Sequence, residues 1–294
     1  MSMWNSDLKP MLLDEKDKPF DSDQYIYELK YDGMRCLIYV SPTSIKIINR
    51  HQKDVTNLFP ELVTIKEIVK EKVIFDGEII CTKGSSPSFS KLQKRLHLKQ
   101  KEKITSSSIN NPATFICFDI IYQNKDLTDL PLIKRKTILK KYQDNDFFVK
   151  TTYTDSGIKL FKEIKKLKLE GIIAKLKTSK YYPDFRTDEW IKIKNYIQEN
   201  FYIGGYFYTD SHVFSVVLGE YVNDDFIFVG KVFVPKKSNL FNALKKEKLC
   251  KSKFINFNES KVNYIKPKYI CKVKYIERTE NNNLRQPFYV KERL

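Results

Sequence analysis

The sequence predicts an α+β protein with two domains, an interpretation that depends on three observations. The chain has 294 residues, more than a single compact domain usually holds. Strand-like and helix-like patterns alternate up to about residue 197, whereas strand-like runs dominate after it. Apolar residues make up 41% of the chain, which is enough for two cores. We therefore expect antiparallel sheets with flanking helices over 1–197 and a small curved sheet over 198–294.

Period-two alternation and β-branched residues predict the strands of the first domain. These strands are expected over 24–29, 35–40, 45–50, 73–81 (interrupted at Gly77), 114–122, 171–176 and 189–195. The run over 114–122 is almost continuously apolar, which is typical of a strand covered on both faces.

Helical spacing of apolar residues predicts four helices in the same domain. They are expected over 60–72, 89–103, 131–143 and 156–171, with a polar loop over 105–112. Ser156 is a suitable N-terminal cap for the last helix, and Gly171 lies near its end.

The second domain is expected to start near residue 198. Strands are predicted over 200–208, 213–221, 226–234 and 268–277, and a lysine-rich helix over 239–253. A small, curved antiparallel sheet with one helix is the pattern of an OB-fold barrel.

Net charge is the strongest clue from composition. The chain carries a formal charge of +17, with 53 Lys and Arg against 36 Asp and Glu. Residues 198–294 hold 17 basic and 10 acidic side chains, so that both predicted domains are basic. This distribution favours a polyanionic partner, and nucleic acid is the usual one, although lysine-rich composition can also serve solubility alone.

Other compositional features favour a cytoplasmic protein without a membrane segment. No apolar run approaches the roughly 20 residues that cross a bilayer, and Asp7, Lys9 and Pro10 interrupt any signal-peptide core at the N-terminus. The five cysteines are odd in number and form no CxxC pair, which argues against a zinc ribbon or a disulfide framework.

The stretch ELKYDGMR (28–35) raises the first chemical question. It places Lys30 directly after a predicted strand and before an Asp-Gly turn, with Arg35 beyond it. A lysine there is most often an ordinary surface residue. A lysine amine that has lost its proton is, however, a good nucleophile, so the motif also suits covalent catalysis.

Further signals follow in one direction along the chain. Arg50 ends a strand, and the FDGE run places Asp76 and Glu78 on one strand face. Phe118 lies on the predicted buried strand over 114–122, where a base could stack, and the EGIIAK run sets Glu170 and Lys175 a strand apart. The full signal set is Arg50, Asp76, Glu78, Phe118, Glu170 and Lys175.

The WIKIK run (190–194) carries the clearest geometry. Period two buries Ile191 and Ile193 and projects Lys192 and Lys194 together from the opposite face. Two neighbouring ammonium groups repel each other unless an anion lies between them, and a phosphate would serve. Alone, such a pair is more typical of a solvated face.

Taken in order, these six motifs resemble the nucleotidyltransferase superfamily of ATP-dependent DNA ligases. The resemblance extends over essentially the whole chain. It is closest to small bacterial and phage ligases and to the ligase module of bacterial end-joining enzymes. The runs FYIGGY, VFSVVLGEY, FIFVGKV and YIKPKYICKVKYIERTENNNLRQPF resemble the OB domain of that family.

The resemblance implies a role for each matching residue. Lys30 would be the nucleophile that carries AMP, Glu28 would recognise the adenine amino group and Phe118 would stack on adenine. Arg35 and Glu78 would lie near the ribose, and Arg50 near the sugar or the 5′-phosphate of the nick. Glu170, with Glu78, would hold Mg²⁺ or Mn²⁺, and the phosphates of ATP would meet Lys175, Lys192 and Lys194.

The implied reaction seals nicks in duplex DNA, and such an enzyme is expected to be monomeric. A DNA-end-binding protein is a possible partner.

In the OB domain, Arg285 and Arg293 would contact DNA or pyrophosphate. The family's last motif normally continues from an arginine to Asp-Lys, which this sequence lacks. Self-adenylylation is therefore expected to be less efficient. Because only a short stretch precedes Lys30, we expect no extra N-terminal domain.

Two other classes stay open from sequence. An RNA ligase or a capping guanylyltransferase would share the lysine motif. A non-catalytic nucleic-acid-binding protein would use the basic OB half alone, but would not need Lys30, Glu170, Lys192 and Lys194 together.

Overall fold

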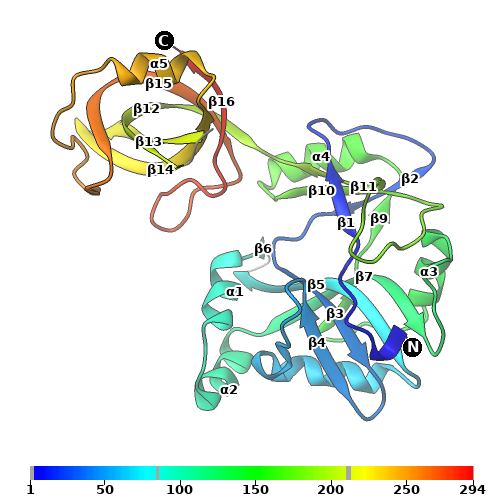
Figure 1. The fold of residues 1–294 in the computed structure, drawn as a ribbon. Helices are drawn as coiled ribbons and strands as arrows, with labels where there is room; N and C mark the ends of the chain where they lie inside the picture. Colours follow the sequence, from blue (N-terminus) through cyan, green and yellow to red (C-terminus); the bar gives the residue numbers. More distant parts are fainter. Residues whose placement is uncertain (1–2, 84–85, 210–212, 294) are drawn as a thin grey trace. The chain divides into compact units, whose positions relative to one another are not determined.

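The computed structural model describes residues 3–83, 86–209 and 213–293. The chain divides into two compact units, Met1–Lys194 and Asn195–Leu294. Unit 1 contains two sheets with helices around them, and unit 2 contains one sheet and a short helix (Figure 1). Among the helices of the described residues, none combines the length and hydrophobicity that a membrane crossing needs.

The first sheet of unit 1 carries the lysine motif. Its strand order is β1-β11-β10-β2-β9, in which β1 runs parallel to β11 and the other neighbours are antiparallel. The strands are β1 (Leu12–Glu15), β2 (Tyr25–Leu29), β9 (Tyr153–Thr154), β10 (Gly171–Leu176) and β11 (Arg186–Lys194). Segments from both ends of the unit therefore lie side by side in one sheet.

The second sheet has the order β4-β3-β5-β7-β8, with β6 paired to β5. Its strands are β3 (Met34–Val40), β4 (Ile45–Asn49), β5 (Val73–Lys83), β6 (Ser86–Pro87), β7 (Ala113–Gln123) and β8 (Phe148–Lys150). One core lies between the two sheets, where Leu37, Ile74 and Ile121 of the second sheet pack with Ile26 and Trp190 of the first.

Helices surround the two sheets. They are η1 (Met3–Asn5), η2 (Thr56–Leu58), η3 (Pro60–Ile68), α1 (Phe89–Leu96), α2 (Lys101–Asn110), α3 (Leu132–Leu139) and α4 (Gly157–Lys166). Phe161 and Ile164 of α4 pack on Ile172 and Ile193 of the first sheet. The opposite face of that sheet carries Ile26 and Trp190 of the core between the sheets and, beside them, polar side chains such as Glu28 and Lys175.

Unit 2 has a single antiparallel sheet that curls around its own core (Figure 1). The strand order is β14-β13-β12-β15-β16. Its elements are β12 (Ile197–Tyr208), β13 (Val213–Val222), β14 (Asp225–Pro235), α5 (Asn239–Lys245), β15 (Asn263–Tyr275) and β16 (Phe288–Arg293). Leu240 and Leu244 of α5 fill the core together with Phe201, Phe214 and Val232.

The predicted α+β class is confirmed, and so are several local predictions. Ser156 caps α4, because its side chain accepts a hydrogen bond from the Lys159 backbone N–H. Ile191 and Ile193 are buried and Lys192 and Lys194 alternate with them, as period two predicts.

Other element predictions were wrong. The segment 60–72 forms a 3₁₀ helix over Pro60–Ile68, and the predicted helix over 89–103 is two helices, α1 and α2. The predicted loop over 105–112 is largely the second half of α2. The helix predicted over 239–253 stops at Lys245.

Strand β5 continues through Gly77, but its pairing with β7 shifts register between Asp76 and Gly77, so the predicted interruption is an irregularity within the strand. A Cβ at Gly77 would lie 2.4 Å from the ring of Phe115, so the glycine admits the neighbouring strand's side chain and does not end the strand.

Candidate active site

The candidate site lies on the face of the first sheet that α4 does not cover. β2 brings Glu28 to this face, and Lys30 follows at its end. In the ladder, Glu28 lies opposite Ile173 and Ile173 lies opposite Lys192, so these positions share one face. By the same alternation β10 adds Lys175 and β11 adds Trp190 and Lys194. The side chains that sequence predicts for a nucleotide site are therefore neighbours across three strands.

A small cavity of about 50 Å³ is lined by side chains from both sheets. The first sheet and its edge contribute Glu28, Lys30 and Lys175, and the second contributes Arg35, Glu78 and Phe118. All six are residues singled out from sequence. All the residues that line the cavity belong to unit 1.

Lys30 is partly buried and ion-paired. Its Nζ lies 2.7 Å from Oε1 of Glu170, and the side chains are 19% and 10% exposed. The backbone N–H of Lys30 donates to the carbonyl of Gly171, which fixes the lysine next to the start of β10. The predicted nucleophile and the predicted metal ligand are thus direct neighbours.

Glu28 lies between two lysines. Lys175 Nζ is 2.8 Å from Oε2 of Glu28, close enough for an ion pair although not aligned as a hydrogen bond. Lys136, from α3, makes an ion pair with Oε1. Burial lowers the pKa of Lys175 to about 8, although the Glu28 carboxylate opposes this shift.

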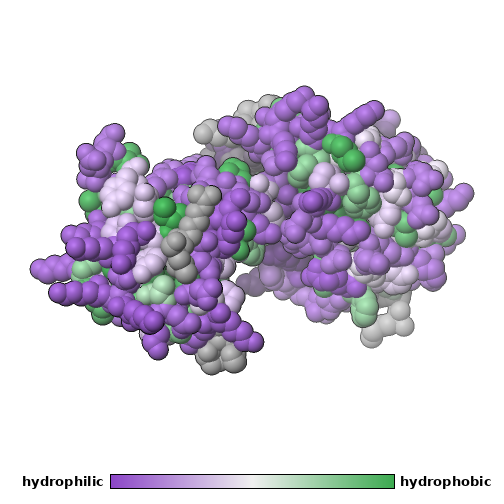
Figure 2. All heavy atoms as spheres, turned by 90° about the horizontal axis from the view of Figure 1, so that it is seen from above, coloured by the Kyte–Doolittle hydropathy of each residue, from purple (hydrophilic) through white to green (hydrophobic). Residues whose placement is uncertain are grey.

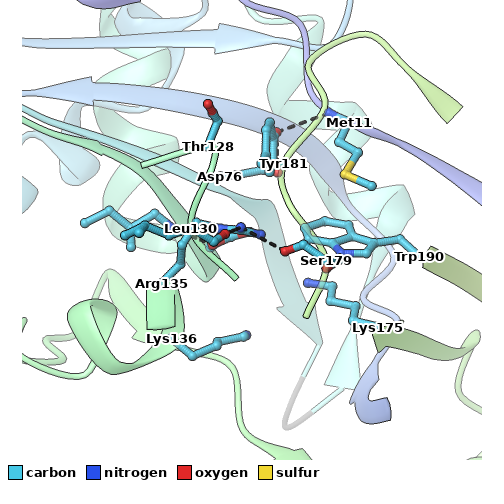
Figure 3. A network of polar contacts seen from close by, with 12 residues as sticks. Met11, Asp76, Thr128, Leu130, Arg135, Lys136, Lys175, Ser179, Tyr181 and Trp190 are labelled. Carbon is cyan, nitrogen blue, oxygen red and sulfur yellow. Dashed lines mark hydrogen bonds and ion pairs between the residues drawn. The ribbon is translucent and has the colours of Figure 1, made fainter. Parts of the chain in front are cut away.

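Arg35 is held by a bidentate pair with Asp76. Its Nε and Nη2 lie 3.1 and 2.7 Å from the two carboxylate oxygens of Asp76. Tyr181 donates to the same carboxylate at 2.8 Å and accepts from the Met11 backbone N–H, and Arg35 donates to the Met11 carbonyl at 2.6 Å. Figure 3 shows Tyr181 pointing toward Met11 beside Asp76. The network anchors the start of β1 against the cavity.

Two aromatic rings flank the Lys175 ammonium group. Its Nζ lies 4.3 Å from the ring centre of Phe118 and 4.1 Å from that of Trp190. The guanidinium carbon of Arg35 also lies 5.3 Å from the ring centre of Phe118. Aromatic faces attract cations, and the same flat faces can stack on a base.

The remaining charges lie around Lys30. Burial raises the pKa of Glu78 to about 8, against the opposing effects of Lys30 and Arg35. Burial also lowers the pKa of Lys194. Lys192 Nζ lies 3.2 Å from Glu15 of β1. An incoming polyphosphate would have to compete with this ion pair.

Six predicted site residues do not line the cavity. Glu170, Lys192 and Lys194 make the ion pairs or share the strand face described above, whereas Arg50, Arg285 and Arg293 do not. Arg50 is exposed just after β4, and its backbone N–H donates to the carbonyl of Arg35. In unit 2, Arg285 pairs with Glu277 at 2.9 Å, and Arg293 is the last residue of β16, opposite Ile270.

Sequence reasoning missed Lys136, Trp190 and Glu15. Trp190 shares its strand face with Lys192 and Lys194, so period two could have found it. Lys136 sits in a helix rich in lysine that reads as a solvated face, and no sequence signal separates it from its neighbours. Glu15 belongs to the short strand β1, which was not predicted.

Glu170 and Glu78 could supply two of the oxygen ligands of a hard divalent cation. Mg²⁺ prefers carboxylate oxygens and usually takes one or two of them together with substrate phosphates. Each of the two carboxylates has Lys30 as a charge neighbour. The described residues contain no group of three or more His, Cys, Asp or Glu able to hold a metal by themselves.

Comparison with known proteins agrees with this geometry. The family model for the ATP dependent DNA ligase domain matches residues 10–194, and that for the ATP dependent DNA ligase C terminal region matches residues 209–294. The SPbeta prophage-derived DNA ligase-like protein LigB of Bacillus subtilis is 32% identical over 204 residues, covering 68% of this chain and 72% of LigB.

A second relative is longer than this chain. The multifunctional non-homologous end joining protein LigD of Mycolicibacterium smegmatis is 28% identical across 96% of this chain, but only 38% of LigD is matched.

Solved structures show the same fold. Mycobacterial DNA ligase D, complexed with ATP and MES, has a TM-score of 0.60 at 24% identity, and 100% of this chain and 96% of that one are covered. A Lig E DNA ligase, from a study of DNA binding with a minimal scaffold, has a TM-score of 0.67 at 14% identity, with 97% and 99% coverage.

Together, fold and matches define a nucleotidyltransferase unit followed by an OB-fold unit. The chain belongs to the family of ATP-dependent DNA ligases.

Proposed function

We propose that this chain joins a 5′-phosphate to a 3′-hydroxyl at a nick in duplex DNA, with Lys30 as the residue that carries AMP. The observation that supports this most is the convergence of Lys30 with Glu28, Arg35, Glu78 and Phe118 around one cavity. An ordinary solvated lysine would not share a cavity with the side chains proposed to bind the base and the ribose of ATP.

The reaction has three displacements. The unprotonated Nζ of Lys30 attacks the α-phosphorus of ATP, a P–N bond forms and pyrophosphate leaves. An oxygen of the DNA 5′-phosphate then attacks the same phosphorus, which moves AMP to the DNA and frees Lys30. Finally the 3′-hydroxyl attacks the 5′-phosphate, AMP leaves and the proton goes to solvent.

The structure supports a division of labour within the cavity. Phe118 and Trp190 offer flat faces to the adenine, and the Glu28 carboxylate can accept a hydrogen bond from its amino group. Lys175 lies at this end of the cavity, between the two rings, so we assign it to the base end of the nucleotide rather than to the phosphates. Lys192 and Lys194 are the better candidates for the phosphates.

Phosphoryl transfer depends mainly on positioning and on neutralising charge. Glu170 and Glu78 would hold a Mg²⁺ or Mn²⁺ ion, which would withdraw charge from the phosphate oxygens when bound. Arg35 is held in place by its ion pair with Asp76. Its positive charge is therefore present in the cavity whether or not a metal ion is bound. Arg50, Arg285 and Arg293 are proposed to contact DNA or pyrophosphate.

We further propose that the enzyme works as a monomer in the cytoplasm. All five cysteines are free thiols and four of them are buried, which suits a reducing compartment. A DNA-end-binding protein is a possible partner.

The test combines nucleotide choice with substrate choice. The protein is incubated with Mg²⁺ and α-labelled ATP, GTP or NAD, and then with a nicked duplex whose strands are either DNA or RNA. We expect label on the protein from ATP alone and joining of the DNA nick. Label from GTP would favour a capping enzyme, and joining confined to RNA would favour an RNA ligase.

A further inference from the structure

Glu28 makes an ion pair with Lys136, a residue that does not line the cavity. Lys136 pairs with Oε1 of Glu28, yet it is absent from the cavity wall, whereas Glu28 and Lys175 both line it. The pair joins α3 to β2 across the two layers of unit 1, and Figure 3 shows Lys136 and Lys175 on separate elements.

The surroundings of Lys136 are unusual for a lysine. Its side chain is 4% exposed, and that of Glu28 is 3% exposed. Lysine is rarely buried unless it is paired, because an ammonium group loses its hydration there. The ring centre of Tyr153 lies 6.0 Å from Lys136 Nζ, and Tyr153 lies on β9, beside β2. A buried, paired ammonium in a packed site can hold only a narrow range of positions.

Each oxygen of a carboxylate can accept more than one hydrogen bond. Lys136 fixes Oε1 from α3, and Lys175 approaches Oε2 from β10. With Oε1 held, Glu28 cannot turn fully toward Lys175, and an oxygen lone pair stays directed into the cavity. Without Lys136, Lys175 would become the sole cationic partner of Glu28 and would draw the carboxylate away from a bound base.

From this geometry we infer that Lys136 is a positioning residue for nucleotide selection: it holds Glu28 so that the carboxylate accepts a hydrogen bond from the 6-amino group of adenine. The inference rests on the proposed function, because it concerns the ATP that Lys30 attacks. Lys136 itself touches no part of the nucleotide.

The experiment compares ATP with purine riboside triphosphate, which lacks only the 6-amino group. Rates of self-adenylylation at several concentrations give kcat/KM for each nucleotide in wild type, Lys136→Met and Lys136→Arg. Lys134→Met is the matched control, because Lys134 lies on the same helix and is exposed. Thermal unfolding of each variant checks that unit 1 still folds.

We expect Lys136→Met to lower the preference for ATP over the analogue by about tenfold or more, the usual effect of losing one charge-assisted hydrogen bond. Lys136→Arg should keep most of the preference for ATP, and Lys134→Met should keep all of it. In a chain that already carries Glu28→Gln, adding Lys136→Met should cause no further loss of this preference. Equal losses with both nucleotides, or an unchanged ratio, would overturn the inference. Failure of the wild type to label with either nucleotide would instead overturn the proposed function.

Discussion

At the residue scale, the site depends on charges that are buried and paired. Lys175, Lys136 and Glu28 lie within unit 1 with almost no exposure, and the partly buried Arg35 forms a second pair with the buried Asp76. Such pairs cost desolvation energy and add little net stability. Their presence around one cavity is better explained by what the cavity binds.

The pKa of Lys175 yields a prediction about stability. Burial lowers it to about 8, so between about pH 8 and 10.5 the unfolded chain binds more protons at this residue than the folded chain. The unfolding free energy contributed by Lys175 is therefore lowest below pH 8 and rises with pH through that interval. Urea unfolding of wild type and Lys175→Met at pH 7.5 and 10 measures the effect.

We expect the difference in unfolding free energy, wild type minus Lys175→Met, to grow more positive at pH 10 by about 1–3 kcal/mol. Lys177→Met is the control, because Lys177 is only partly buried on the same segment. A difference that stays constant, or that falls with pH, would contradict the burial argument.

At the element scale, β10 sets the position of Glu170. Gly171 follows Glu170 with φ of +154°, and a Cβ there would lie 2.2 Å from the carbonyl oxygen of Ile193. Only glycine lets the strand begin this close to β11. The close approach places Glu170 next to Lys30.

Gly171→Ala is expected to destabilise unit 1 by about 1–3 kcal/mol and to slow self-adenylylation more than tenfold, since the shift falls on Glu170. Thermal unfolding and label transfer from ATP measure the two effects. Gly230→Ala is the control, because its nearest neighbour, Leu284 Cβ, would lie 3.5 Å away. Equal effects of the two substitutions would show that the close approach at Gly171 does not matter.

Strands could be predicted better than helices because their signal is local and simple. In β11, apolar residues alternate with lysines, and this alternation directly predicts which face of the strand is buried; the residues are Ile191 and Ile193, and Lys192 and Lys194. The segment Pro60–Ile68 has helical spacing, yet forms a 3₁₀ helix, and spacing alone does not distinguish the two geometries. Short β1 was missed because its pairing partner lies far away in sequence.

The same limit applies to the site. Motif residues that reach the cavity could be selected from their order along the chain. Lys136 could not, since its burial depends on packing between α3 and β2 that no local pattern records.

At the scale of the whole molecule, charge is the dominant property. The chain carries a formal charge of +17, and in the face shown in Figure 2 hydrophilic side chains predominate while apolar ones form small separate groups. This surface suits a polyanion better than a large apolar partner.

Binding to nicked DNA should therefore depend steeply on salt. If six or more phosphates are contacted, the affinity should fall by about 10³-fold or more between 50 and 200 mM salt. Fluorescence anisotropy of a labelled nicked duplex gives the slope. Self-adenylylation in the absence of DNA is the reference and should change far less. A shallow slope for DNA would contradict binding through phosphate contacts.

The central claim is that Lys30 carries AMP, and locating the adenylylated residue tests it most directly. After incubation with ATP and Mg²⁺, the protein is digested and its peptides are analysed by mass spectrometry, alongside Lys30→Ala. We predict one adenylyl group on the peptide that contains Lys30, with cleavage after Lys30 blocked, and none in the variant. An adenylyl group on any other residue, or one that persists in Lys30→Ala, would contradict the account.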